Sequence, residues 1–364
     1  MKGLNMENIN NIYSSPPGTA VMPPVIPDKE EKRQIRRQYN KTALILIINM
    51  VIFNVISRLV LVGICMFMGG GFSREAYAAG SEMFSADPLL STLFSIGTPI
   101  VSETISILLG VKLLGINFKK LSAREGYGGG TVMKLMVLCL GLQLAAGIIA
   151  MILQLIFGMF GLESATADLT ATPSFLANAL LYFYACLLGP VLEELLYRGV
   201  LLQSMRKYNE RFAIFLSAAI FGLMHQNYQQ FILGFLLGIP LAAITVKYGS
   251  IIPSIFTHIV VNTSGMLALC LIQYYAPDAV DDLTAAVDFG TEGNLIIMAI
   301  GFSRIALAIA GLVIGIMALV KGGNMSRPTP AGKARSKVFF TAPLWWIVMI
   351  AYLFLCFVLP FMLY

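Results

Sequence analysis

Charged residues are what this sequence has least of. Only 12% of its 364 residues are charged, whereas an average soluble domain has about 25%. A soluble globule of this length needs far more surface charge, but a surface that faces lipid needs almost none. Hydrophobic residues make up 57% of the chain, which favours a bilayer as its solvent. The net charge of +6 does not indicate a nucleic-acid partner, because the basic residues fall between apolar segments.

Several common signatures of metal and nucleophile chemistry are also missing. The five cysteines each lie in an apolar run and form no C-x-x-C pair, so neither a thiolate metal site nor a redox pair is predicted. The only two histidines form no H-E-x-x-H motif, and no G-x-S-x-G motif is present. A soluble zincin or serine-hydrolase mechanism therefore has no support. No internal repeat is evident, which argues against the inverted-repeat transporter folds.

Long apolar stretches recur instead. A hydrocarbon core of about 30 Å takes roughly 20 helical residues, and backbone that faces lipid must be helical to satisfy its amides. Nine stretches qualify, the fifth of them short: 43–68, 89–115, 131–160, 174–205, 211–226, 229–247, 251–274, 295–320 and 343–363. We therefore expect an all-α, polytopic transmembrane helical bundle of about nine spans.

The loops between these stretches alternate in charge. Cytoplasmic loops are enriched in Lys and Arg. Basic residues gather in 29–41, 112–130, 206–211 and 321–337, whereas the intervening loops 69–88, 161–173 and 275–294 are mainly acidic. This alternation predicts a multi-pass cell-membrane protein with a cytoplasmic N-terminus. We divide the chain into a disordered basic cytoplasmic tail, N-terminal transmembrane helices, a four-helix core and C-terminal transmembrane helices: 1–42, 43–160, 174–274 and 295–364.

A few ionisable side chains lie within the spans, where charge is costly and usually functional. Arg58 and Glu103 fall in the first two spans, and we expect them to form a structural pair. Glu193, Glu194 and Arg198 gather within six residues of the fourth span. Residues four apart share a helical face, so Glu194 and Arg198 can pair while Glu193 is rotated about 100° away.

That pairing leaves Glu193 free to act as a general base. The alternative is a buried ion pair that only fixes helix packing. The two histidines favour catalysis, because His225 and His258 lie in spans next to this helix. Glu193 and His225 are each about 15 residues from the turn between their spans, which places them at the same depth, roughly 22 Å. His258 and Asn262 lie roughly 13–20 Å beyond the next turn, so all four can meet.

Such a site can hydrolyse an amide in two ways. It offers a base for water and donors for the developing oxyanion, with no cofactor. It also offers three ligands for a divalent metal such as zinc, namely Glu193, His225 and His258, with an open fourth position. The sequence leaves both mechanisms open.

Close helix packing is predicted beside this site. Gly234 and Gly238 form a G-x-x-x-G motif on the sixth span. Small residues at this spacing let helix backbones approach each other. We expect the motif to pack against a neighbouring helix of the same chain.

The order of three motifs, E-E-x-x-x-R, F-x-x-x-H and H-x-x-x-N, resembles the CAAX-processing and bacteriocin-processing (CPBP, or Abi) membrane endopeptidases. The resemblance covers about residues 174–270. The residues that carry it are Glu193, Glu194, Arg198, Phe221, His225, His258 and Asn262. It implies that Glu193 and His225 activate water. It also implies that His258 and Asn262 stabilise the oxyanion, and that the remaining three residues support the site.

The resemblance further implies a membrane-associated peptide or protein substrate, either prenylated at its C-terminus or bacteriocin-like. Similar bacterial proteins are tied to bacteriocin immunity. Both metalloprotease and glutamate-type mechanisms are attributed to the family. A different class of function also fits the same buried groups, namely a non-catalytic scaffold or a proton-coupled transporter. A transporter needs a continuous polar route across the membrane, whereas a protease needs a one-sided cavity.

Overall fold

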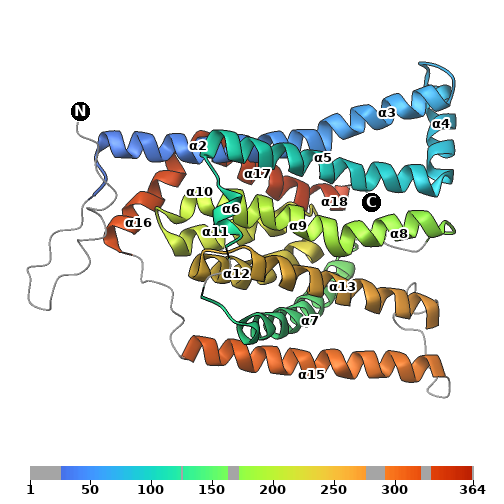
Figure 1. Cartoon of the computed structure of the whole chain (residues 1–364). Coiled ribbons are helices and arrows are strands. Elements are labelled where there is room, and N and C mark those ends of the chain that lie inside the picture. The colour runs from blue at the N-terminus through green and yellow to red at the C-terminus, as the bar shows by residue number, and fades with distance from the viewer. Residues whose placement is uncertain (1–25, 124–125, 163–171, 276–291, 321–328, 363–364) are drawn as a thin grey trace, which may run out of the picture.

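The computed structural model describes residues 26–123, 126–162, 172–275, 292–320 and 329–362. Within these ranges the regular elements are all helical, and the long helices lie side by side in one bundle (Figure 1). The all-α transmembrane bundle predicted from the sequence is therefore confirmed.

The helices of the first half are α2 (Lys29–Val51), η2 (Ile52–Ile56), α3 (Ser57–Met68), α4 (Arg74–Ala86), α5 (Pro88–Leu114), α6 (Phe118–Leu121) and α7 (Gly129–Met159). The central helix is made of α8 (Phe175–Phe183), η3 (Tyr184–Leu188), α9 (Gly189–Glu194), η4 (Leu195–Leu201) and α10 (Leu202–Arg206). The remaining helices are α11 (Glu210–Leu223), α12 (Tyr228–Tyr248), α13 (Ile252–Tyr275), α15 (Glu292–Val320), α16 (Pro330–Lys337), η5 (Val338–Thr341), α17 (Pro343–Phe357) and α18 (Leu359–Met362). The segments η2, η3 and η4 are π-helical.

Seven of the described helices are long and apolar enough to cross a membrane. An eighth span results if Pro330–Thr341 and Pro343–Phe357, which meet at 73°, are counted together. The fifth predicted stretch forms α11, whose 14 residues extend only about 21 Å and do not reach across a bilayer core. The count is therefore close to the nine expected, with α11 as a partial span.

Polar side chains fix where many of these helices begin. Ser, Thr, Asp and Asn at the N-cap accept hydrogen bonds from the first free backbone amides of a helix. Residues in this role include Asp28, Ser73, Asp87, Asn117, Ser174, Asn209, Asn227 and Thr329. The chain thus marks its helix starts even where the helices themselves are uniformly apolar.

Two predictions about segments outside the spans need correction. Residues 29–42 were assigned to a disordered tail, but they form the first turns of α2, whose buried side chains include Ile35 and Tyr39. The rest of that tail, 1–25, lies outside the described residues. The predicted loop 69–88 contains helix α4, which Ser73 caps.

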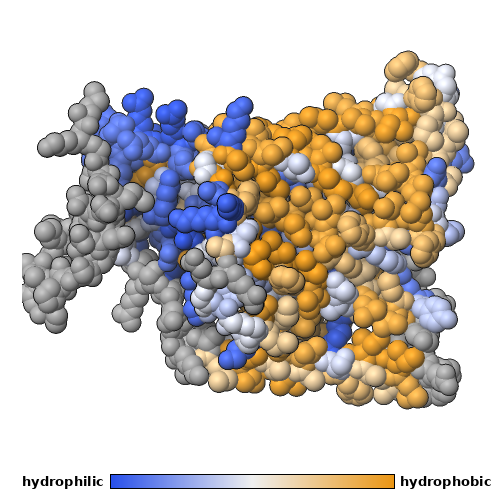
Figure 2. Space-filling model, viewed as in Figure 1, coloured by the Kyte–Doolittle hydropathy of each residue, from blue (hydrophilic) through white to orange (hydrophobic). Residues whose placement is uncertain are grey.

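Segments predicted to face the cytoplasm gather at one end of the bundle. The backbone amide of Ile251, at the start of α13, donates to the carbonyl of Leu121 at the end of α6. Arg335 of α16 contacts Glu31 of α2 at 2.7 Å. Figure 2 shows a hydrophilic cap at this end and a broad hydrophobic belt beside it. The chain is a multi-pass membrane protein, and the cytoplasmic location of this end stays a prediction.

The central helix, 175–206, holds the middle of the bundle. Its residues Leu196–Leu202 are buried and belong to a core shared with α2, α5, α11 and α17. Helix α5 approaches it closely, because a Cβ at Gly110 would lie 2.5 Å from the side chain of Val200.

Helices α11 and α12 form a tightly packed hairpin. A Cβ at Gly234 would lie 2.8 Å from the Cα of Gly222, and one at Gly238 would lie 2.8 Å from the Cα of Ala218. Only glycine permits such approaches. The predicted packing of the G-x-x-x-G motif within the chain is confirmed, and it fixes the turn that carries His225.

Candidate active site

Two π-helical segments flank the glutamate pair. Segment η3 ends at Leu188 and η4 begins at Leu195, so Glu193 and Glu194 lie on the short α-helical stretch between them. A π-helical insertion shifts the side chains that follow it around the helix, and such insertions are frequent at functional sites. Glu194 is fully buried, whereas the Glu193 side chain keeps 11% of its surface exposed.

Glu194 is held by two partners. Its Oε1 lies 2.9 Å from an Arg198 nitrogen one helical turn on, as the spacing predicts, and both side chains are fully buried. The same Oε1 lies 3.0 Å from His258 Nδ1. The guanidinium of Arg198 also lies 4.2 Å from the ring centroid of Phe221, a cation–π contact. Glu194 and Arg198 thus form a closed pair that leaves Glu193 outside it.

Phe221 is the hub of the aromatic packing. Its ring stands edge-on to the imidazoles of both His225 and His258, with centroids 5.5 Å apart in each case. It also packs against Tyr197, at 5.4 Å. One side chain of α11 therefore sets the orientation of both histidines and covers Arg198.

His258 bridges the two carboxylates. Since Glu194 is paired with a cation, its oxygen accepts, and His258 Nδ1 must be the donor. The other ring nitrogen, Nε2, lies 3.5 Å from Glu193 Oε2, too far for a strong hydrogen bond.

His225 lies in a turn, and its predicted place inside a span is wrong. Helix α11 ends at Leu223, and Gln226 has φ +58°, the only non-glycine residue with positive φ in the described chain. Such a conformation costs about 1–2 kcal/mol. Asn227 holds the turn: its amide nitrogen donates to the carbonyl of His225, and its oxygen caps α12 by accepting from Gln230. Asn227 was not predicted, although its position before a new helical stretch is an N-cap signal.

Asn262 reaches across to the central helix. Its amide nitrogen donates to the carbonyl of Ala185 at 3.0 Å. In a π-helical segment this carbonyl pairs with the amide five residues later, which here is Pro190, a residue with no N–H. The proline thus leaves an acceptor that Asn262 satisfies with one of its two hydrogens. The other hydrogen is available for a ligand.

Glu193, His225, His258 and Asn262 all line one pocket of about 460 Å³. Gln143, Asn227 and Gln230 add polar groups to its wall. Apolar side chains line the rest, including Phe53, Met224, Leu233, Leu237, Met266 and Leu269. The structure therefore brings together the four residues that the depth argument placed at one level.

The same residues do not fit a metal site in this arrangement. Among the described residues, no group of three or more His, Cys, Asp or Glu side chains is placed to hold a metal ion. Of the three predicted zinc ligands, only Glu193 and His258 approach each other, and His258 Nδ1 is committed to Glu194.

A third buried carboxylate lies beside the site. Glu103 of α5 is only 2% exposed, and neither of its oxygens has a hydrogen-bond partner in the described chain. Its predicted pairing with Arg58 is wrong, because Arg58 is exposed and forms no ion pair with it. Helix α5 instead packs against α9, the segment that carries Glu193. Its place as a charged residue within a span was a sequence signal for a functional role, but the predicted pairing with Arg58 gave Glu103 a structural role instead.

Comparison with known proteins finds a match to the region that contains these site residues. A family model described as Type II CAAX prenyl endopeptidase Rce1-like matches residues 175–264, a range that contains all seven motif residues. No curated protein and no solved structure matches the chain. Residues 175–264 are therefore similar to the Rce1-like type II CAAX prenyl endopeptidases, the resemblance that the order of the motifs predicted.

Proposed function

We propose that this protein is an intramembrane endopeptidase that hydrolyses a peptide bond through Glu193, His225, His258 and Asn262. The family match over residues 175–264 supports protease activity. The observation that carries the specific proposal is the shared pocket, in which Glu193 is the one glutamate of the pair left with an open carboxylate.

Water activation falls to Glu193 and His225. A water between them loses a proton to the Glu193 carboxylate while its oxygen adds to the peptide carbonyl carbon. His225 lines the pocket. Neither of its two ring nitrogens is hydrogen-bonded to a described residue, so the imidazole can orient that water. The pocket is largely apolar, which strengthens both interactions.

The oxyanion then needs donors. Asn262 offers the hydrogen that Ala185 leaves unused. His258 can add an Nε2–H only as the imidazolium, because its Nδ1–H is donated to Glu194. Glu194 thus holds the imidazole in place by accepting from Nδ1. The tetrahedral intermediate collapses when the C–N bond breaks and the proton taken from water passes to the leaving nitrogen. The products are a carboxylate and an amine.

The substrate class follows from the pocket wall. Most of the pocket wall is made of apolar side chains, and the pocket lies within the helical bundle. An extended peptide with a hydrophobic attachment or side chain fits such a wall better than a polar soluble peptide does. A prenylated C-terminal peptide or a bacteriocin-like peptide at the bilayer is therefore the proposed substrate.

The test is cleavage of a farnesylated CAAX-type reporter peptide in membranes. Wild type is compared with Glu193→Gln and His225→Ala, each expected to lose about 100-fold or more in rate. Glu82→Gln removes an exposed carboxylate on α4 and serves as the matched control. Unchanged processing in both site variants would contradict the proposed endopeptidase activity and favour a non-catalytic scaffold or a proton-coupled transporter.

A chelator series in the same assay separates the two mechanisms. The arrangement of donors predicts that activity survives removal of divalent metal ions. Loss of activity on chelation, with recovery on adding zinc, would show that the ligands rearrange around a metal that this geometry does not accommodate.

A further inference from the structure

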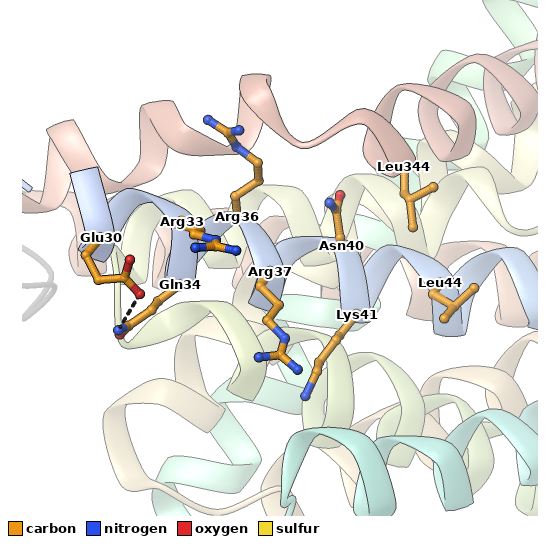
Figure 3. Close-up of a pocket in the computed structure, with 9 residues that line it drawn as sticks. All are labelled: Glu30, Arg33, Gln34, Arg36, Arg37, Asn40, Lys41, Leu44 and Leu344. Atoms are coloured by element: carbon orange, nitrogen blue, oxygen red, sulfur yellow. Dashed lines mark hydrogen bonds between the residues drawn. The ribbon is translucent and has the colours of Figure 1, made fainter. Parts of the chain in front are cut away.

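A cationic groove runs along the exposed face of α2 at the polar end of the bundle. It has a volume of about 770 Å³, and its walls are almost all from one helix (Figure 3). The residues that line it are Glu30, Arg33, Gln34, Arg36, Arg37, Asn40, Lys41, Leu44 and Leu344. Four of these are cations and one is an acid. These cations could serve either ion pairs within the protein or contacts with lipid.

Ion pairing accounts for little of it. Glu30 accepts a hydrogen bond from Gln34, and the neighbouring Glu31 forms an ion pair with Arg335. Neither Arg33 nor Arg37 has an ion pair or a side-chain hydrogen bond to any described residue, and both are exposed. These two guanidinium groups are therefore available to an external anion.

The other two cations are partly engaged and so less mobile. Arg36 donates to the Thr341 hydroxyl at 3.1 Å, and Lys41 donates to the carbonyl of Leu113 at 3.3 Å. The Lys41 ammonium has two further hydrogens to offer. In Figure 3, Arg37 and Lys41 extend their charged ends toward the same side of α2. Their spacing of four residues continues the row that Arg33 begins.

The groove is also amphipathic along its length. Its charged part lies in the first turns of α2, and its far end is formed by the apolar side chains of Leu44 and Leu344. Trp346, half exposed, lies two residues further along α17, and tryptophan is typical of the interface between headgroups and hydrocarbon. A phosphate beside arginines, with hydrocarbon beginning one or two turns away, is the layout of a phospholipid.

We propose that this groove binds an anionic phospholipid, with its phosphate held by Arg33, Arg37 and Lys41 and its acyl chains along Leu44 and Leu344. A polybasic stretch that only sets topology needs no common face and no apolar end. The charge complementarity and the adjoining leucines favour a lipid over a soluble anion.

The test uses the full-length protein, purified in a nonionic detergent, and a fluorescent phosphatidylglycerol as the bound probe. Unlabelled phosphatidylglycerol is expected to displace it, while phosphatidylcholine and inorganic phosphate at matched concentrations are not. Near a membrane surface each Lys or Arg contributes enough that one removed cation lowers affinity about fivefold, and three lower it roughly a hundredfold.

The decisive variant is Arg33→Gln/Arg37→Gln/Lys41→Gln. Its control, Lys120→Gln/Lys333→Gln/Lys337→Gln, removes the same charge from exposed sites at the same end of the bundle and should bind like wild type. The single variant Arg37→Gln covers the case in which the triple variant does not fold. Equal losses in the two triple variants, or displacement by phosphatidylcholine or inorganic phosphate as strong as by phosphatidylglycerol, would overturn the proposal.

Discussion

Removing Arg198 should destabilise the protein more than any other change in the site. Its guanidinium is fully buried, 2.9 Å from Glu194 and 4.2 Å from the ring of Phe221. Taking away one partner of a buried ion pair costs about 3–5 kcal/mol, because the other charge stays buried without compensation. Loss of the desolvated cation–π contact adds up to about 2 kcal/mol. We expect Arg198→Met to lose about 5 kcal/mol.

The double variant Arg198→Met/Glu194→Gln should recover more than half of that loss. It leaves no unpaired charge, and replacing a whole buried pair is often nearly neutral. The Gln side chain oxygen can still accept from His258. The assay is reversible unfolding of the purified protein in mixed micelles, followed by circular dichroism across an SDS titration. A double variant no more stable than Arg198→Met would refute the ion pair as the source of the stability.

Three smaller predictions follow from single contacts, all read out by the same unfolding assay. Gly238→Ala places a Cβ against the backbone of α11 and should cost about 1–3 kcal/mol, whereas Gly63→Ala, with open space around it, should cost nothing. Asn262→Ala leaves the Ala185 carbonyl unpaired and should cost about 1–3 kcal/mol; a loss near zero would mean that water replaces the amide. Gln226→Gly should gain about 0.5–1 kcal/mol, since relief of the positive φ exceeds the added chain entropy, and a loss would contradict strain in the turn.

Helical periodicity explains what could be predicted here. Four-residue spacing is enough to pair Glu194 with Arg198 and to leave Glu193 apart, and rise per residue is enough to bring His225 to the level of Glu193. The first inference uses only spacing around one helix, and the second uses only the rise along two helices joined by a short turn. The three-motif order then singled out the central helix and its neighbours, and the family match covers that same region.

Rotation of one helix against another could not be predicted in the same way. Arg58 and Glu103 were expected to pair because they occupy adjacent spans, yet Arg58 is exposed while Glu103 turns inward beside the site. Uniformly apolar helices carry little sequence signal for which face is buried. The turn at His225 was missed for a different reason: Gln226 has no turn signature of its own, and the neighbouring Asn227, which holds the turn, was not recognised as an N-cap.

Heavy-oxygen water tests the central claim most directly. Purified wild-type protein is incubated with the farnesylated reporter peptide in oxygen-18 water, and the new C-terminal carboxylate is analysed by mass spectrometry. Hydrolysis at the proposed site predicts one heavy oxygen in the wild-type product and no product above background from Glu193→Gln. Labelled product formed by Glu193→Gln at the wild-type rate would contradict the assignment of Glu193 as the base.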